Sequence, residues 1–310
     1  MRLEIRMHTP SQGQSTIRAE MDIGRRCIPQ FAWPTVILGV ALYAGFAAVV
    51  VLAVGKMIPL WLAIVLNSIF IYSFYTVVHE AVHGNISSRI KGRRWVDVVA
   101  GTACCAPLWL MFDHHKKSHM VHHSHTNEDD DPDIYARGSF PGWLLHRLPI
   151  SLLSYFNPFT LLAECRKFGC SKSETRRSAI AFTTYTALAL IVIAGGYGYE
   201  LLTLWLVPWW IGQTVMLTLF TWTPHHDHHE TSRYRNTRVA IWPGAELLLL
   251  GQNMHLIHHM MPAIPFYRYR KTFDDLRPIL EQHDVRIEGF WPKTPQRDLS
   301  NLEPVSRIPR

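Results

Sequence analysis

Charged residues are nearly absent from two long stretches of this sequence. Between residues 31 and 78 the only one is Lys56, and between residues 178 and 222 the only one is Glu200. Each stretch is about twice the roughly 20 apolar residues that cross a bilayer as a helix, whereas buried helices of soluble cores run for about 10–14. Glycine or proline interrupts each stretch near its middle. The pattern excludes an ordinary soluble domain and predicts an all-α integral membrane protein.

The two interrupted stretches predict two helical hairpins, which together give four transmembrane helices. We place the spans near 31–54, 58–78, 178–197 and 200–222. Thirty of the 31 Lys and Arg residues lie before, between or after the hairpins. Since such residues stay on the cytoplasmic side, we expect a multi-pass protein with both termini and a helical cap in the cytoplasm. The predicted parts are a polar N-terminal tail (1–30), a membrane domain (31–290) and a C-terminal tail (291–310).

Several other features are missing. The five cysteines are odd in number and lack a metal-knuckle spacing, so they predict neither a disulfide framework nor a zinc knuckle. Residues 1–30 contain no short apolar core followed by a cleavage site, so we expect no removed signal peptide and an anchoring first span. No compact basic motif accompanies the net charge of +7, so we expect no nucleic-acid partner; the basic residues flank the spans, where anionic lipid head groups lie.

A further apolar segment, 95–112, separates the two hairpins. It contains Asp97 and Pro107. A charged residue and a helix breaker do not suit a membrane span, so we predict a re-entrant or interface-lying element rather than a fifth span.

Histidine is abundant and clustered. Fifteen of the 18 histidines fall in the windows 79–83, 114–125, 225–229 and 255–259. His8, His146 and His283 lie elsewhere and are taken as surface residues. The first histidine window continues directly from the second predicted span. The third histidine window begins just after the fourth predicted span. All four windows are therefore expected close to the cytoplasmic membrane surface, where they would meet a membrane-dissolved substrate.

The histidine spacing repeats. The first window has a pair four residues apart, and the second and fourth each contain H-x-x-H-H. Positions i, i+3 and i+4 share a helix face, so each cluster is expected to point two or three imidazoles at one point. Imidazole binds iron, zinc, copper or nickel, and eight imidazoles suit two metals rather than one. The candidate ligands are His79, His83, His119, His122, His123, His255, His258 and His259, with His225 as a ninth.

Six other histidines fit no repeated spacing and are expected in supporting or surface roles: His114, His115, His125, His226, His228 and His229. Two remote alternatives remain. Residues 79–83 also match H-E-x-x-H, typical of a zinc protease, but that site needs one further ligand and leaves both H-x-x-H-H clusters unexplained. A metal transporter would carry ionisable residues inside its spans, whereas Lys56 and Glu200 lie only at the turns.

Over residues 35–285 the chain resembles the membrane fatty-acid desaturase and hydroxylase superfamily. The resemblance rests on the three histidine clusters in this order, with Thr126-Asn127 and Asp131-Pro132-Asp133 after the second. It implies a non-haem di-iron centre with two iron ions that uses dioxygen to oxidise an unactivated C–H bond. Hydroxylation and desaturation then differ by how the substrate is placed.

Within that superfamily the chain is most similar to beta-carotene 3-hydroxylases of the cyanobacterial type. The similarity lies in Pro224-His225, in 235–239, in 250–259 and in 262–269. The glutamate after His79, where an aspartate is common, and the extra histidines of 225–229 depart from it. The resemblance implies a carotenoid ring substrate. Acyl desaturases share the clusters, so a fatty-acyl desaturase or hydroxylase of lipid metabolism is the alternative.

The resemblance also implies an external electron donor such as a ferredoxin, since the sequence contains no haem-binding module. Arg268, Arg270 and Lys271 are candidates to dock an acidic carrier or, equally, to anchor lipid head groups. We expect supporting acceptors to orient the ligand rings, and the candidates are Glu80, Asp131, Asp133 and Asn253. Replacing His122 or His258 with alanine is predicted to abolish iron loading and turnover.

Overall fold

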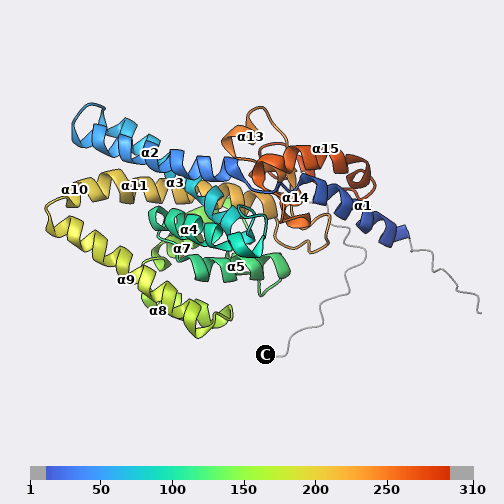
Figure 1. The fold of residues 1–310 in the computed structure, drawn as a ribbon, viewed down its shortest axis with the longest axis horizontal. Coiled ribbons are helices and arrows are strands. Elements are labelled where there is room, and N and C mark those ends of the chain that lie inside the picture. Colours follow the sequence, from blue (N-terminus) through green and yellow to red (C-terminus); the bar gives the residue numbers. More distant parts are fainter. Residues whose placement is uncertain (1–11, 294–310) are drawn as a thin grey trace, which may run out of the picture.

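The computed structural model describes residues 12–293, with side chains from residue 16 onward, and the fold is mostly helical (Figure 1). Residues 1–11 and 294–310 lie outside the described part, and with them most of the predicted C-terminal tail.

Within residues 12–293, four helices are long and apolar enough to cross a membrane, in agreement with the four predicted spans. They are α2 (Trp33–Val54), α3 (Leu60–His83), α9 (Lys172–Ala194) and a helix over Gly198–His225. The last consists of α10 (Gly198–Leu201), η5 (Leu202–Leu206), α11 (Val207–Leu217), η6 (Thr218–Trp222) and α12 (Thr223–His225), of which η5 and η6 are π-helical. Helices α3 and α9 extend beyond the predicted limits because polar residues continue a helix past its apolar run.

A sharply bent pair of helices lies between the second and third spans. It consists of η1 (Lys91–Arg93), α4 (Arg94–Cys105) and η2 (Ala106–Leu108), followed by α5 (Phe112–Ser124) at an angle of 95°. At the break, the carbonyl of Leu108 accepts hydrogen bonds from Trp209 Nε1 at 2.8 Å and from Gln213 Nε2 at 3.0 Å. These two side chains of α11 supply hydrogen bonds to a backbone carbonyl at the point where the helix is interrupted. The bend fits the re-entrant element predicted for 95–112.

Short helices connect α5 to α9, and α8 packs against both. They are η3 (Pro132–Ala136), α6 (Phe140–Gly142), the π-helical η4 (Trp143–Arg147), α7 (Leu148–Ser154) and α8 (Pro158–Lys167). Ser171 caps the start of helix α9: its side chain accepts from the N–H of Glu174, while the Glu174 carboxylate accepts from the N–H of Ser171. This capping box fixes where the third candidate span starts.

The last part of the chain forms a cap beyond the ends of α3 and α12. It contains β1 (Val239–Ala240) paired in parallel with β2 (Ile287–Glu288), and the helices α13 (Ala245–Leu248), η7 (Gln252–Met254), α14 (His255–Met260), η8 (Phe266–Arg268) and α15 (Tyr269–Leu280). Helix α1 (Gln12–Cys27), within the segment predicted as a polar tail, packs on α15 (Figure 1). Its Glu20 is fully buried, 2.9 Å from Arg233.

Helix α3 is the centre of the membrane part. It packs against α2, α4 and α11, and its last twelve residues are all buried. The side chain of Asn67 donates to the carbonyl of Leu204 at 2.8 Å, which links α3 to the fourth span. In contrast, α9 buries only Ser178 among its residues and contacts α10 at one end and α5 and α8 at the other. The rigid packing of α3 positions the histidines at its end.

Candidate metal centre

The end of α3 presents two buried histidines one helical turn apart, His79 and His83. The helix ends there because Gly84 has a φ of +72°, and its N–H donates back to the carbonyls of the last turn. Glycine adopts this left-handed conformation without the steric cost of a β-carbon. The cap therefore ends α3 directly after its second candidate ligand.

Helix α14 brings the last histidine cluster to the end of α3. It begins at His255, just after Gly251, whose φ is +78°. A β-carbon on Gly251 would lie 2.6 Å from the carbonyl oxygen of Phe266, so this close approach requires glycine. The turn thereby sets the direction in which α14 starts.

Five imidazoles form what we call the first histidine group: His79, His83, His119, His123 and His258. Their Nε2 atoms face one another. The Nε2 of His119 lies 2.9 Å from that of His83 and 3.1 Å from that of His123. The Nε2 of His258 lies 3.0 Å from that of His79 and 2.8 Å from that of His123.

Four imidazoles form the second histidine group: His122, His225, His255 and His259. The Nε2 of His225 lies 3.0 Å from that of His255, and the Nε2 of His122 lies 3.3 Å from that of His259. All nine histidines predicted as ligands thus fall into two groups, and in each group the ligand atoms lie within 4.8 Å of one another.

The spacing of the nitrogens fits bound metal ions. Two imidazoles that bind one ion at about 2.1 Å and at right angles place their nitrogens about 3.0 Å apart. Six Nε2–Nε2 distances within the groups, of 2.8 to 3.3 Å, match this value. Facing lone pairs at such distances repel one another unless a proton or a cation lies between them. The donor set is therefore suited to two cations that accept nitrogen ligands, one in each group.

Each H-x-x-H-H cluster points two imidazoles at one group, within the predicted two or three, and its third imidazole belongs to the other group. On α5, His119 and His123 belong to the first group and His122 to the second; on α14, His258 belongs to the first. Residues i and i+4 differ by about 40° around a helix, whereas i+3 and i+4 differ by about 100°. Each i, i+4 pair therefore serves one group, and the i+3 residue turns toward the other.

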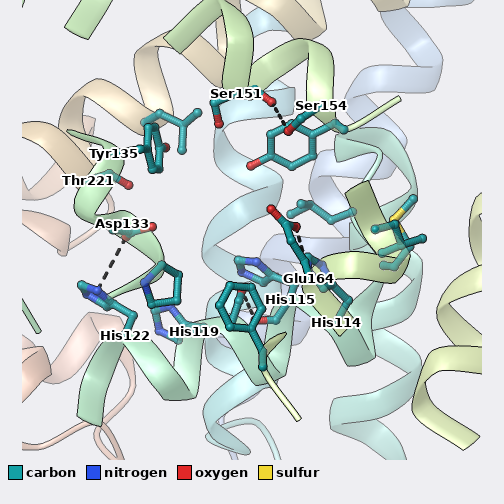
Figure 2. Close-up of a pocket in the computed structure, with 18 of the residues that line it drawn as sticks. His114, His115, His119, His122, Asp133, Tyr135, Ser151, Ser154, Glu164 and Thr221 are labelled. Carbon is teal, nitrogen blue, oxygen red and sulfur yellow. Dashed lines mark hydrogen bonds and ion pairs between the residues drawn. The ribbon is translucent and has the colours of Figure 1, made fainter. Parts of the chain in front are cut away.

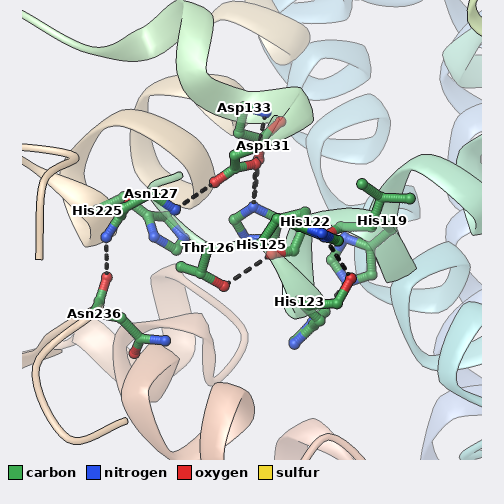
Figure 3. A network of polar contacts seen from close by, with 12 residues as sticks. His119, His122, His123, His125, Thr126, Asn127, Asp131, Asp133, His225 and Asn236 are labelled. Atoms are coloured by element: carbon green, nitrogen blue, oxygen red, sulfur yellow. Dashed lines mark hydrogen bonds and ion pairs between the residues drawn. The ribbon is translucent and has the colours of Figure 1, made fainter. Parts of the chain in front are cut away.

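Contacts at the Nδ1 atoms hold several of these rings in orientation. We assign the Nδ1 proton to His122, which donates to Asp131 Oδ1 at 2.8 Å (Figure 3), and to His258, which donates to Tyr269 Oη at 2.9 Å. The Nδ1 of His259 lies 3.4 Å from Thr126 Oγ1. In each case Nε2 keeps its lone pair for the group. These contacts are the kind of outer support that fixes the orientation of metal-binding imidazoles.

Only one of the four predicted supporting residues hydrogen-bonds a histidine of the groups. Asp131 does so, while Asp133 Oδ2 lies 3.7 Å from His122 Nδ1, too far for a hydrogen bond. Glu80 accepts from the N–H of Phe266, and Asn253 donates to the carbonyl of Ala240. Helical spacing could not predict these contacts of Tyr269 and Thr126, because neither residue lies on the same helix as the histidine it contacts.

The remaining described histidines join neither group. His115 lies beside His119, and its ring stacks on that of His119 with centroids 5.9 Å apart. His228 is buried, with its ring centroid 6.1 Å from that of His225, and neither ring nitrogen has a hydrogen bond. His283, predicted to be a plain surface residue, stacks on Tyr234 with ring centroids 3.8 Å apart.

Burial keeps the imidazoles neutral in the cap. It lowers the pKa of His255, His258 and His259 well below the usual value of a histidine, and the neighbouring imidazoles lower it further. Burial alone would raise the pKa of Asp131, but the hydrogen bond with His122 and two backbone N–H donors hold it below the usual value. Burial lowers the pKa of His122, but the carboxylates of Asp133 and Asp131 outweigh it and raise that pKa above the usual value. Metal binding requires the neutral imidazole, so a metal ion in the second group would displace any proton from His122 Nε2.

A cavity of about 160 Å³ reaches both groups. His119 of the first group and His122 of the second line one end of it (Figure 2). The rest of the wall mixes apolar residues of the spans, such as Met216 and Leu217, with polar residues of the connecting helices, such as Ser151 and Tyr155. A molecule in this cavity would lie next to both candidate ions.

The profile of the family named "Fatty acid desaturase" matches residues 55–291. The chain belongs to the fatty acid desaturase family. The match covers all nine histidines of the two groups, the bent helix pair and three of the four candidate spans entire. The chain is accordingly a membrane protein of a family of oxygen-dependent oxidoreductases that act on lipids and depend on a di-iron centre.

Relatives of two kinds are similar over most of the chain. An sn-1 oleoyl-lipid 12-desaturase of Picosynechococcus sp. is 25% identical over 85% of this chain and 81% of its own length. A beta-carotene ketolase of Paracoccus sp. is 24% identical over 78% of this chain and 87% of its own length. The chloroplastic omega-6 fatty acid desaturase of Spinacia oleracea is 25% identical over 84% of this chain and 62% of its own length. Desaturases and ketolases are thus about equally similar to this desaturase-family protein.

Proposed function

We propose that this protein is a membrane di-iron oxygenase that hydroxylates a ring C–H bond of a carotenoid. The observation that carries the proposal is a cavity of about 160 Å³ with one histidine of each group in its wall. A cavity of about 150 Å³ is large enough to bind benzene, so this one matches a six-membered ring in size. The likeness of 250–259 to carotenoid hydroxylases and the beta-carotene ketolases among the relatives support a carotenoid substrate.

The nine imidazoles would hold the two iron ions, five in the first histidine group and four in the second. When bound, iron supplies the dioxygen chemistry that oxidises an unactivated C–H bond. The residues of the chain hold the ligands in place and position the substrate. Asp131 and Tyr269 fix the rings of His122 and His258 through their Nδ1 atoms. The fourth span contributes the apolar Met216 and Leu217 and the polar Thr221 to the cavity wall.

The proposed topology consists of two hairpins with the cap on the cytoplasmic side. Nearly all Lys and Arg residues lie outside the two hairpins, which supports a cytoplasmic location for both histidine groups and both termini. The four candidate spans and the position of His83 at the end of α3 are consistent with this arrangement. The metal centre would then lie at the membrane surface, within reach of a substrate dissolved in the bilayer.

An external carrier such as a ferredoxin would supply the electrons. Of the three candidate docking cations, Arg270 pairs with Glu246 at 2.8 Å and Lys271 pairs with Asp275 at 2.6 Å. These partners neutralise two of the charges, so Arg268, which is exposed and has no carboxylate partner among the described ion pairs, becomes the main candidate. Replacing Arg268 with Glu should slow reduction by an acidic ferredoxin more at low than at high salt.

A fatty-acyl desaturase or hydroxylase is the second candidate, supported by the lipid desaturases among the relatives. A zinc protease is not supported. Its glutamate would have to act as a base beside the peptide, whereas Glu80 is fully buried and accepts a hydrogen bond from the N–H of Phe266. A metal transporter is not supported either, because the family match indicates an oxidoreductase.

The deciding experiment is expression in a host that accumulates beta-carotene, followed by chromatography and mass spectrometry of the pigments. New mono- or dihydroxylated carotenoids are expected with the unmodified protein and with His146→Ala, since His146 is exposed and belongs to neither group. They should be absent with His258→Ala. Unchanged pigments together with altered membrane acyl chains would replace the carotenoid proposal by the desaturase.

A further inference from the structure

The helices between the bent pair and α9 have two chemically different faces. We call residues 140–167, which comprise α6, η4, α7 and α8, the amphipathic segment. Four large apolar side chains of this segment are 61 to 78% exposed: Leu145, Ile150, Leu153 and Phe159. Ile150 and Leu153 are three residues apart on α7, so they share a face. Together the four side chains give the segment an exposed apolar face outside the four candidate spans.

A neighbouring face of the same segment lines the cavity beside the histidines. Ser151, Ser154 and Tyr155 come from α7 and the residue after it, and Leu161 and Glu164 come from α8 (Figure 2). On α7 the cavity residues 151 and 154 each follow directly after an exposed apolar residue, at 150 and 153. One thin layer of helix therefore separates the exposed apolar face from the cavity.

The charges at the end of the segment indicate what covers the apolar face. Five exposed cations follow within fifteen residues of Leu162: Arg166, Lys167, Lys172, Arg176 and Arg177, the last of which pairs with Asp113. The third candidate span begins at Lys172. Helices with apolar residues on one face and cations beside it lie in the membrane surface, where the cations meet anionic head groups. A bilayer covers such a face without any protein partner.

We propose that the amphipathic segment lies in the cytoplasmic surface of the bilayer and admits the lipid substrate to the cavity. The partly exposed residues of the cavity wall include His114 on α5 and Glu164 on α8, with 15% and 41% of their side chains exposed and 3.1 Å between His114 Nε2 and Glu164 Oε2. The opening thus lies beside α8, at the level of its cations. A substrate that leaves the bilayer past α8 would reach His119 and His122 without crossing water.

The position of the segment can be measured without any turnover. The full-length protein, in a Cys170→Ser background because Cys170 is only partly buried, would carry Ile150→Cys or Phe159→Cys labelled with an environment-sensitive fluorophore. The matched control is Glu281→Cys, at the end of α15 in the cap, where the side chain is 61% exposed. Vesicles would contain equal parts of phosphatidylcholine and phosphatidylglycerol. The two quenchers are brominated acyl chains and aqueous iodide.

Labels at residues 150 and 159 should be quenched by the brominated lipid and protected from iodide, and the label at residue 281 should behave in the opposite way. Quenching of all three by iodide alone would overturn the proposal. Protection of residues 150 and 159 from both quenchers would also overturn it, because a protein partner or a second copy of the chain would then cover the face.

Substitutions that place a charge on the apolar face test whether the substrate passes this face on its way to the cavity. Ile150→Asp and Phe159→Asp should raise the apparent KM for the membrane-dissolved substrate about tenfold, corresponding to about 1.4 kcal/mol, with unchanged iron content. Ile150→Leu should retain the original KM. An unchanged KM in both aspartate variants would overturn the access role.

This access role rests on the proposed function, whereas the quenching result does not. If no hydroxylated carotenoid forms but the labels lie in the bilayer, the carotenoid assignment fails and the membrane position stands. The KM measurements then use the acyl lipid that is turned over.

Discussion

His122 and Asp131 form a buried pair, with Nδ1 of the imidazole 2.8 Å from a carboxylate oxygen. The same carboxylate accepts from the N–H of Asn127 at 2.7 Å and from that of Asp133 at 2.8 Å. Asn127 in turn donates to the carbonyls of Glu230 and Asn236 (Figure 3). One carboxylate therefore orients a histidine of the second group and folds the turn after α5, and that turn is hydrogen-bonded to the loop after His225.

Asp131→Asn should weaken metal binding in the second histidine group. The amide cannot accept all three hydrogen bonds, so the ring of His122 loses its fixed orientation, and losses of about 10- to 100-fold in metal affinity or activity are expected. Iron per chain and turnover would be measured on the purified protein. Asp129→Asn is the control, because Asp129 is exposed and pairs with Arg137 at the surface. Equal iron content in the two variants would contradict the role of Asp131.

Tyr269→Phe should affect the first histidine group and leave the fold intact. It removes the acceptor for Nδ1 of His258 and leaves a buried N–H unpaired, at a cost of about 1–3 kcal/mol. The expected result is weaker iron retention during dialysis against a chelator. Tyr267→Phe, two residues earlier and only partly buried, should retain iron like the unmodified protein. Identical retention in both variants would exclude an orienting role for Tyr269.

The division of the histidine clusters predicts which alanine variants resemble one another. His258→Ala and His123→Ala should both lose iron from the first group, while His122→Ala and His255→Ala should lose it from the second. Turnover should be lost in all four. Mössbauer spectra of iron-57-loaded protein would distinguish the two patterns. If the spectra of His122→Ala and His123→Ala were alike, the division of these two neighbouring residues between the groups would be contradicted.

Ser154→Phe should fill the cavity without disturbing the metal centre. Ser154 lines the cavity, and its hydroxyl donates to the carbonyl of Ser151 within α7. A phenyl ring at this position occupies the space we assign to the substrate, so turnover should fall at least about tenfold, corresponding to about 1.4 kcal/mol. Iron content should not change. Ser154→Ala, which leaves the cavity open, should remain active; full activity of the phenylalanine variant would place the substrate elsewhere.

Glu20→Ala should loosen α1 from the cap. The carboxylate is fully buried and accepts from Arg233 and from the hydroxyl of Tyr234. Its removal takes away a hydrogen bond to a charged group from both Arg233 and Tyr234, at a cost of about 1.5–3 kcal/mol each at most, because Arg233 is partly exposed to water. Trypsin should then cut faster after Arg25 and Arg26 in the variant. Asp22→Asn, a change at an exposed residue of the same helix, should leave the rate of cleavage unchanged.

The sequence by itself determined the candidate membrane spans and the nine candidate ligands. The length of an uncharged run must match the thickness of a bilayer, and histidines at i and i+4 must share a helix face, so both features can be read locally. The start of α9 at Lys172 and the continuation of α3 to His83 are less predictable, because caps and polar residues extend a helix beyond its apolar run.

Only the tertiary structure decided how the ligands are shared and what surrounds them. Helical spacing fixes the angles between side chains on one helix, but not the rotation of that helix relative to its neighbours. That rotation places His258 with His79 and sends His259, the next residue, toward His122. Tyr269 and the part of the cavity wall from α7 likewise belong to other segments than the histidines they lie beside. Their separation from those histidines in the sequence does not predict the contact. Contacts between separate elements follow from packing, and packing is a property of the whole fold.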